Sequence, residues 1–313
     1  MIELGSRPAL TALVGALLDA WPEHRRYVER SFESRPADTL DVSEDVSGLI
    51  LALSKRLPGG LTSLCADYRY LCDVIVMPEE IYFRRHGRYR LSSFADANRE
   101  CYANPPMMNR YMNGLLLSNV FWNNHARVFS YFARDYLGSL PAGASLLEIG
   151  PGHGLFLFFA ARRADRGAVT GWDISETSVA NTREALRAMA LDGAVDLAVR
   201  DWFAPDNGDT EQFDAIVLSE ILEHLEDPVG ALRLAHRRLK PGGTVFVNVP
   251  ANSPAPDHIY LVNSPEHAAA LAVEAGFEIL DSAAFPMTGA TLDRARKQKL
   301  AISCAVVGRR PSR

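Results

Sequence analysis

The stretch Leu146-Leu147-Glu148-Ile149-Gly150-Pro151-Gly152-His153-Gly154 decides the fold. An apolar run ends in an acid and three alternate glycines, and an apolar segment that can open a helix follows it. Glycine adopts positive φ at no steric cost and lets a ligand approach the backbone closely. The pattern is therefore typical of a strand that turns into a nucleotide-binding loop.

The spacing of these glycines restricts the class of ligand that the loop can bind. A dinucleotide fingerprint has its third glycine one position later, where this chain has Leu155, and it places a pyrophosphate on the helix N-terminus. Here the third glycine is Gly154, and Glu148 at the strand end would repel a phosphate. The loop therefore disfavours a dinucleotide, an alternative that a titration with nicotinamide cofactors can exclude.

Further strand-like segments follow in order, and several end in a polar tip. Asp173 stands at one such tip, at a distance from the glycine loop that suits a carboxylate holding ribose hydroxyls. Helical segments such as 176–189 and 228–239 alternate with them, which predicts βαβ crossovers and a parallel sheet. The strand-like segments are residues 169–175, 197–203, 213–220 and 239–250.

In this order the segments resemble the class I S-adenosylmethionine-dependent methyltransferases over roughly the second half of the chain. The resemblance implies an α/β, Rossmann-like sheet of seven strands, mostly parallel, with helices on both faces. Residues 277–284 and 299–307 would supply the last two strands, the final one antiparallel. The implied cofactor is S-adenosyl-L-methionine. The residues implied to bind it are Glu148, Gly150, Pro151, Gly152, Gly154, Asp173, Ile174, Asp201, Trp202 and Ser219.

The same resemblance assigns roles at the strand tips. Asp173 would bind the ribose hydroxyls, and Ile174 would cover one face of the adenine. Asp201 would accept the adenine amino group, with Trp202 beside it. The alternative for Asp201 is an acid that forms a surface turn.

The first 140 residues differ from the rest because their apolar residues follow a helical spacing. We expect a mainly helical N-terminal cap and substrate domain over residues 1–140, and a cofactor-binding domain over residues 141–313. Within the cap, residues 81–91 predict a small hairpin that turns at His86-Gly87. Helices followed by a hairpin resemble the winged-helix-like N-terminal domains of some natural-product methyltransferases.

Residues 105–137 predict one or two helices that are rich in aromatic side chains and asparagine. Family members commonly build the substrate pocket from the segment before the first strand; the alternative is packing between cap and core or in a dimer interface. Asn124 could orient a substrate amine or carboxylate. Histidine is best suited to accept a proton near neutral pH, and the candidates are His125, His224 and His258.

The segment after the fourth strand offers acidic residues and a histidine. Glu220, Glu223 and His224 stand at i, i+3 and i+4, so on a helix they could share a face and bind a divalent ion. Similar segments are metal ligands in ubiquinone-pathway O-methyltransferases and small-RNA terminal methyltransferases, whereas in other relatives they cap a helix. We expect no metal and assign Glu220 and His224, with Asn124 and His125, to catalysis.

The expected activity is methyl transfer to a small-molecule acceptor, either an aromatic compound or an amino acid of secondary metabolism. A rival reaction uses the same cofactor: its amino group attacks its own chain and yields azetidine-2-carboxylate and methylthioadenosine. An aromatic, asparagine-rich pocket would suit the sulfonium in that cyclase through cation–π contacts. Such a pocket could include Tyr111, Phe121, Trp122, Asn123 and Asn124.

Composition, charge and hydrophobicity argue against nucleic-acid-binding and membrane-spanning classes of protein. The chain has 313 residues, 48% hydrophobic and 23% charged, with a net charge of −5, which gives no general electrostatic reason to bind nucleic acid. No apolar run reaches the roughly 18 residues that span a membrane. Four cysteines without metal-ligand spacing read as reduced thiols of a cytoplasmic protein. A homodimer through the N-terminal domain stays open.

Overall fold

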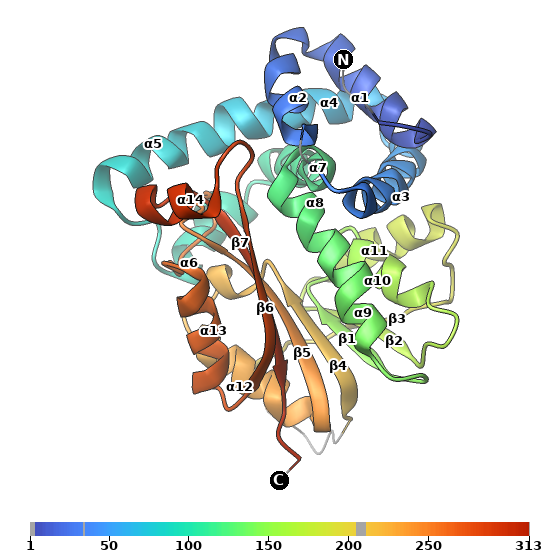
Figure 1. The fold of residues 1–313 in the computed structure, drawn as a ribbon, viewed down its shortest axis with the longest axis vertical. Coiled ribbons are helices and arrows are strands. Elements are labelled where there is room, and N and C mark those ends of the chain that lie inside the picture. The colour runs from blue at the N-terminus through green and yellow to red at the C-terminus, as the bar shows by residue number, and fades with distance from the viewer. Residues whose placement is uncertain (1–3, 34, 205–210, 313) are drawn as a thin grey trace. The chain divides into compact units, whose positions relative to one another are not determined.

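The computed structural model describes residues 4–33, 35–204 and 211–312, which fold into two compact units (Figure 1). Each unit is assembled from three segments of the chain. Unit 1 comprises Met1–Ser130, Asn252–Leu261 and Phe285–Ile302, and unit 2 comprises Tyr131–Ala251, Val262–Ala284 and Ser303–Arg313. Two segments from the carboxyl-terminal half therefore complete the unit that the amino-terminal half begins.

Unit 2 is built on a seven-stranded sheet with the strand order β3-β2-β1-β4-β5-β7-β6. Strand β1 pairs in parallel with β2 and β4, β2 pairs in parallel with β3, and β4 pairs in parallel with β5. Reciprocal bonds between Arg310 and the turn at Gly242 and Gly243 join the end of β7 to the start of β5, as in an antiparallel pair. The strands are β1 (Leu146–Ile149), β2 (Val169–Asp173), β3 (Asp196–Val199), β4 (Phe213–Ser219), β5 (Leu239–Ala251), β6 (Glu278–Pro286) and β7 (Ile302–Arg309).

Helices cover both faces of this sheet, α10 and α11 on one and α12 and α13 on the other (Figure 1). Phe246 of β5 anchors an aromatic core, with ring centroids 5.0 Å from Phe132 and 5.1 Å from Tyr136. The Rossmann-like fold class predicted from the sequence is confirmed. The helices of unit 2 are η4 (Tyr131–Tyr136), α9 (Leu137–Ser139), α10 (Leu155–Ala161), α11 (Glu176–Ala188), η5 (Leu222–His224), α12 (Pro228–Arg238) and α13 (Pro265–Glu274).

Unit 1 is mainly helical, as the sequence predicts. None of the helices in the described ranges combines the length and the apolarity needed to cross a membrane. They are α1 (Pro8–Ala20), η1 (Pro22–His24), α2 (Arg25–Phe32), α3 (Ala37–Ser54), α4 (Gly60–Tyr70), η2 (Leu71–Val76), α5 (Met77–His86), α6 (Phe94–Ala97), η3 (Asn98–Tyr102), α7 (Pro105–Phe121), α8 (Asn123–Ser130) and α14 (Leu292–Gln298).

The hairpin predicted at residues 81–91 is wrong. Residues up to His86 belong to α5, and Gly87 adopts φ 66° and donates its N–H to the carbonyl of Phe83 at 2.7 Å. This is the C-terminal cap of a helix, which uses the same left-handed glycine as a tight turn. An ion pair between Glu80 and Arg84, at i and i+4, further supports the helix.

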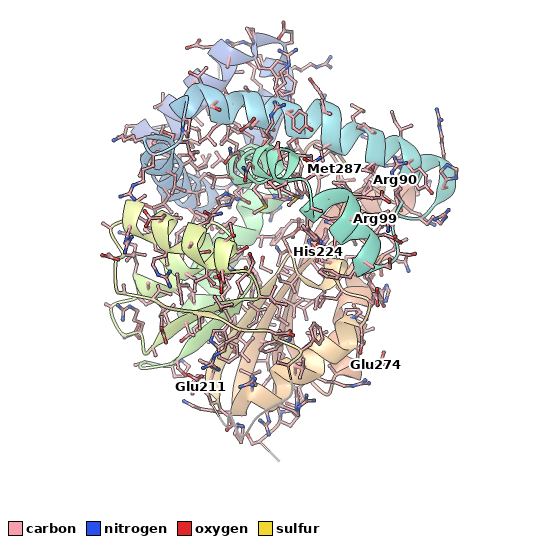
Figure 2. All side chains as sticks on the ribbon, turned by 180° about the vertical axis from the view of Figure 1, so that it is seen from behind. Arg90, Arg99, Glu211, His224, Glu274 and Met287 are labelled. Atoms are coloured by element: carbon pink, nitrogen blue, oxygen red, sulfur yellow. The ribbon has the colours of Figure 1, made fainter. Side chains whose placement is uncertain are left out.

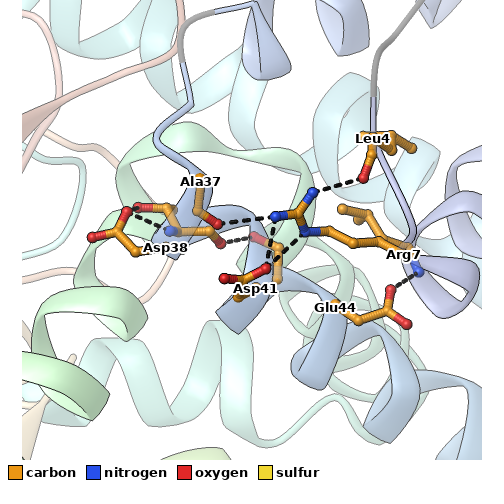
Figure 3. A network of polar contacts seen from close by, with 9 residues as sticks. Leu4, Arg7, Ala37, Asp38, Asp41 and Glu44 are labelled. Atoms are coloured by element: carbon orange, nitrogen blue, oxygen red, sulfur yellow. Dashed lines mark hydrogen bonds and ion pairs between the residues drawn. The ribbon is translucent and has the colours of Figure 1, made fainter.

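The start of α1 is held by side chains of α3 (Figure 3). The Glu44 carboxylate accepts hydrogen bonds from the backbone N–H groups of Ala9 at 2.9 Å and Leu10 at 2.7 Å. Arg7 donates to the Asp41 carboxylate at 2.6 Å. First-turn N–H groups have no partner within their own helix, so these contacts supply the cap that the sequence around α1 lacks.

The end of α7 is capped by a buried cation. The Arg35 guanidinium, 6% exposed, donates to the carbonyl of Val120 at 2.9 Å and to the Ser31 hydroxyl at 2.8 Å. Ser31 in turn donates to the carbonyl of Phe121 at 2.7 Å. The negative end of the α7 dipole therefore faces this charge, which favours a cation there. Burial lowers the pKa of Arg35 to about 9.

Candidate functional site

The loop between β1 and α10 requires its glycines. Gly150, Gly152 and Gly154 have φ values of 64°, 52° and 71°. A Cβ on Gly150 would lie 2.5 Å from Cδ1 of Ile221, so this position needs both left-handed backbone and empty space. The Thr182 hydroxyl donates to the carbonyl of Gly152 at 2.7 Å and fixes the loop. The result is a rigid turn with a bare backbone.

This loop lies at the carboxyl ends of the parallel strands. Ile149 pairs with Leu218, and Ser219 pairs with Asn248. Gly150, Ser219 and Asn248 therefore follow one another across the neighbouring strands β1, β4 and β5. In open α/β sheets, ligands bind at this edge.

Glu148 lies inside unit 2. It is 2% exposed, and desolvation raises the pKa of its carboxyl group well above the ordinary value. Its Oε2 has no hydrogen-bond partner among the described residues. Burial without a full set of hydrogen-bond partners disfavours the charged form of this carboxyl group.

The end of β2 offers a carboxylate and an apolar surface. Asp173 accepts a hydrogen bond from the backbone N–H of Ser175 at 2.9 Å, and burial raises the pKa of the Asp173 carboxyl. Ile174 is 68% exposed, which is the highest value among the large hydrophobic residues of the described ranges. The pair presents one polar and one apolar group to the same edge of the sheet.

The residues after β3 differ from one another in burial. Asp201 is exposed, and its carboxylate accepts the N–H of Phe203 at 2.9 Å. Trp202 packs inside unit 2, where its Nε1 donates to the carbonyl of Ala231 at 3.3 Å. Phe203 is 48% exposed. The turn at Asp201 thus directs Trp202 into the core and Phe203 outward.

Ser219, Glu220 and Asn248 form a hydrogen-bonded group. The Asn248 amide nitrogen donates to the Ser219 hydroxyl at 3.0 Å and to the Glu220 carboxylate at 2.8 Å. Glu220 has φ 53°, a left-handed conformation that is rare for a residue with a side chain. The sequence analysis missed Asn248. Its only signal is one polar residue in the apolar run Val245–Val249.

Glu220, Glu223 and His224 do not share a helix face. Helix η5 begins at Leu222, and the positive φ of Glu220 leaves that residue outside it. Glu223 is fully buried, and its carboxylate lies 3.7 Å from Nε2 of the adjacent His224. Figure 2 labels His224. The helical ligand arrangement considered for a divalent ion is therefore not formed by these three residues.

Asn124 and His125 belong to unit 1. Asn124 is 6% exposed, and the His125 ring lies 4.8 Å from that of Trp122 in an edge-on arrangement. Nδ1 of His125 lies 3.1 Å from the Ser118 hydroxyl, and desolvation lowers the pKa of His125 to about 4. His125 is therefore neutral at physiological pH.

His258 also belongs to unit 1, in the segment that follows β5. Its Nδ1 lies 2.7 Å from the carbonyl of Ser253, which can only accept, so Nδ1 carries a proton. The neighbouring Asp257 is 4% exposed and accepts a hydrogen bond from the Tyr111 hydroxyl at 3.0 Å. These contacts fix the segment within unit 1.

Known proteins match the part of the chain that holds the glycine loop. A family model described as "Methyltransferase domain" matches residues 147–245. The ubiquinone biosynthesis O-methyltransferase of Pseudomonas syringae pv. tomato is 35% identical over 116 residues, which are 36% of this chain and 47% of that protein. The protein of the same name from Alkalilimnicola ehrlichii is 34% identical over 125 residues, 39% of this chain and 48% of that protein. The chain thus spans about half the length of these curated relatives.

Two solved structures are similar to part of this chain at lower sequence identity. The N-methyltransferase NodS from Bradyrhizobium japonicum, in complex with S-adenosylhomocysteine, is 19% identical with a TM-score of 0.45, covering 60% of this chain and 87% of that one. The N-terminal domain of EvdMO1 with bound S-adenosylhomocysteine is 16% identical with a TM-score of 0.42, covering 56% of this chain and 79% of that one.

Proposed function

Because a family model described as "Methyltransferase domain" matches residues 147–245, we propose that the chain is a class I S-adenosylmethionine-dependent methyltransferase, which transfers the methyl group of S-adenosylmethionine to a small-molecule acceptor. The acceptor we propose is an aromatic compound or an amino acid of secondary metabolism. The O-methyltransferase names of the relatives support a small acceptor. Part of the proposal is that the enzyme works in the cytoplasm, without nucleic acid.

One observation carries this proposal: a glycine loop with a bare backbone lies at the carboxyl edge of the sheet, beside a half-buried acid and an exposed apolar side chain. In the proposed complex the backbone at Gly150, Gly152 and Gly154 contacts the methionine and ribose parts of the cofactor. Asp173 accepts hydrogen bonds from the ribose hydroxyls, and Ile174 covers one adenine face.

The residues after β3 complete the adenine side of the proposed site. Asp201 is exposed and can accept a hydrogen bond from the adenine amino group. Phe203 offers an exposed aromatic surface next to Asp201, whereas Trp202 is buried and its indole N–H is bonded to the carbonyl of Ala231. We therefore assign Trp202 a supporting role behind Asp201.

S-adenosylmethionine supplies a sulfonium methyl group that is displaced in line by the acceptor, so the protein's task is to hold and align the reactants. We assign the acceptor side to the N-terminal region, residues 1–140, and the cofactor side to residues 141–313. His125 is neutral and can accept a hydrogen bond from the acceptor, with Asn124 beside it. Glu220 and His224 are the matching candidates at the end of β4.

The test is an incubation of the purified chain with S-adenosylmethionine, followed by mass spectrometry. S-adenosylhomocysteine that forms only when an aromatic or amino acid acceptor is added supports methyl transfer. Methylthioadenosine and azetidine-2-carboxylate that form without an acceptor would instead identify the cyclase reaction. A chain that does not bind S-adenosylmethionine at all would contradict both. Asp173→Asn serves as a variant weakened in cofactor binding.

A further inference from the structure

Asn248 is a buried amide whose orientation is fixed by its partners. It is 4% exposed, and its nitrogen lies 2.8 Å from a carboxylate oxygen of Glu220. An ionised carboxylate only accepts hydrogen bonds, so the amide must point its NH₂ group toward Glu220. The same nitrogen donates its second hydrogen to Ser219 at 3.0 Å. Both donors of Asn248 are thus in use.

The remaining atom of this amide, Oδ1, is buried and has no hydrogen-bond partner in the described part of the chain. Leaving a buried acceptor unpaired is unfavourable, and such atoms are rare in folded proteins. A ligand that donates a hydrogen bond would satisfy it. Asn248 Oδ1 is therefore a candidate acceptor for a hydrogen bond from a bound ligand.

The position of Asn248 agrees with a ligand contact. It pairs with Ser219 at the carboxyl ends of β5 and β4, and Gly150 occupies the next position on β1. Residues that pair directly in a parallel sheet place their side chains on the same face. Asn248 and Ser219 therefore share one face at the edge that holds the glycine loop.

We propose that Asn248, together with Ser219 and Glu220, receives a protonated amino group of a bound ligand; this inference rests on the proposed function. The group combines an acceptor oxygen, a hydroxyl and a carboxylate, and a carboxylate or phosphate ligand would be repelled by Glu220. An ammonium group supplies several N–H donors and the positive charge that the Glu220 carboxylate favours. A hydroxyl could pair with Oδ1 but would gain nothing from that charge.

A protonated amine can come from two sources at this site. One is the methionine end of the cofactor, and the other is an amine or amino acid acceptor. Both offer the same chemistry to Asn248, so the experiment needs one arm for each source. S-adenosylhomocysteine and 5′-methylthioadenosine differ by the amino acid end and define the cofactor arm. Tyramine and 4-ethylphenol form the acceptor arm, because only tyramine carries an amino group.

The experiment measures dissociation constants by calorimetry for the full chain and for Asn248→Leu, Asn248→Asp and Thr244→Val. Tyramine and 4-ethylphenol are titrated into protein saturated with S-adenosylhomocysteine. Thr244→Val is the matched control, because it removes a hydroxyl from the same strand, four residues before Asn248. We expect Asn248→Leu to raise the dissociation constant of either S-adenosylhomocysteine or tyramine at least tenfold. The matching compound without the amino group, 5′-methylthioadenosine or 4-ethylphenol, should keep its dissociation constant within twofold. Asn248→Asp keeps an acceptor oxygen but loses the NH₂ donors that face Glu220 and Ser219, so it should weaken amine binding less than Asn248→Leu does.

The outcomes separate this inference from the proposed function. Wild-type binding of S-adenosylhomocysteine tests the proposed function alone. If the wild type binds it, equal weakening of S-adenosylhomocysteine and 5′-methylthioadenosine in Asn248→Leu would show a general packing role and overturn the inference. Unchanged affinity for S-adenosylhomocysteine, with no preference for tyramine over 4-ethylphenol in the wild type, would also overturn it. Circular dichroism and thermal melting verify that each variant is folded.

Discussion

The Ser118 hydroxyl fixes the tautomer of His125. Ser118 Oγ donates its single hydrogen to the carbonyl of Leu115 at 2.7 Å and lies 3.1 Å from Nδ1 of His125. A hydroxyl has one hydrogen, so when Ser118 donates to Leu115, Nδ1 carries a proton and donates it to Ser118. The neutral imidazole therefore presents Nε2 as an acceptor.

A proton on Nδ1 of His125 predicts the ¹⁵N spectrum of the imidazole. In the wild type at pH 7, His125 should show a protonated Nδ1 and an unprotonated Nε2. Ser118→Ala should shift the ring toward the other tautomer, whereas Ser47→Ala, a buried helix serine that bonds to the carbonyl of Ser43, should leave it unchanged. Long-range ¹H–¹⁵N correlation spectra measure this. A wild-type spectrum with protonated Nε2 would contradict the assignment.

Acid should destabilise the protein through histidines that are neutral in the fold. Desolvation lowers the pKa of His24, His125 and His153 from 6.5 to about 4. Between these values the unfolded chain binds more protons than the native one, so the free energy of unfolding rises with pH there and falls as pH drops from about 6.5 toward 4. Urea denaturation at several pH values measures the slope. His125→Gln should make it shallower, and an identical slope would refute the assignment for that residue.

Glu148 should have the opposite pH dependence. The pKa of its carboxyl is raised well above 4.5 in the fold, so its contribution to stability is present below pH 4.5 and is lost as pH rises. Glu148→Gln replaces a neutral acid by a neutral amide and removes this loss. We expect the variant to be more stable than the wild type at pH 8, with a smaller difference at pH 5. Equal pH profiles in urea denaturation would argue that Glu148 is ionised in the fold.

Gly150→Ala should destabilise unit 2 through two separate effects. A left-handed alanine costs about 1–2 kcal/mol, and its Cβ would lie 2.5 Å from Ile221, adding about 1–3 kcal/mol of overpacking. Gly193 is the matched control, because it also has a positive φ, 71°, but a Cβ added there would meet no atom within 4 Å. Denaturant titration should show a larger loss for Gly150→Ala, and Ile221→Ala should restore part of it. Equal losses at the two glycines would remove the steric argument.

Arg35→Met should loosen the end of α7. The substitution leaves buried oxygens of Ser43, Ser31 and Val120 without their donor, at about 1–3 kcal/mol for each group that stays unpaired. Arg26→Met, at an exposed arginine of α2, should change the free energy of unfolding by no more than about 0.5 kcal/mol. Thermal or urea unfolding compares the two. A similar small effect for Arg35→Met would mean that water donates hydrogen bonds to these oxygens in the variant.

The sequence predicts the strands and the glycine loop of unit 2 well because each signal there is local. The apolar runs of β1, β2, β4 and β5 and the glycines of the loop all lie in the predicted order. The hairpin at residues 81–91 failed because a left-handed glycine such as Gly87 serves both a turn and a helix cap. Asn248 was missed because one polar residue in a strand is common, and only its contacts reveal its buried oxygen.

The membership of the units could not be read from the sequence for a different reason. Residues 252–261 and 285–302 join unit 1 through contacts with partners far away in the chain, such as Asp257 with Tyr111 and Asn123 with Thr288. Periodicity and turn residues report on neighbours along the chain only. Whether residues 1–140 act as one acceptor-binding region remains a prediction.

The three-segment construction of unit 1 sets the order in which the protein can fold during synthesis. Its last segment ends at Ile302, so the amino-terminal helices cannot reach their final packing until nearly all of the chain has left the ribosome. Unit 2 likewise needs β7, which ends at Arg309. Domains usually fold one after the other as they emerge, whereas here both must wait and finish almost together. Apolar surfaces of the early helices that pack against these late segments stay exposed for that interval.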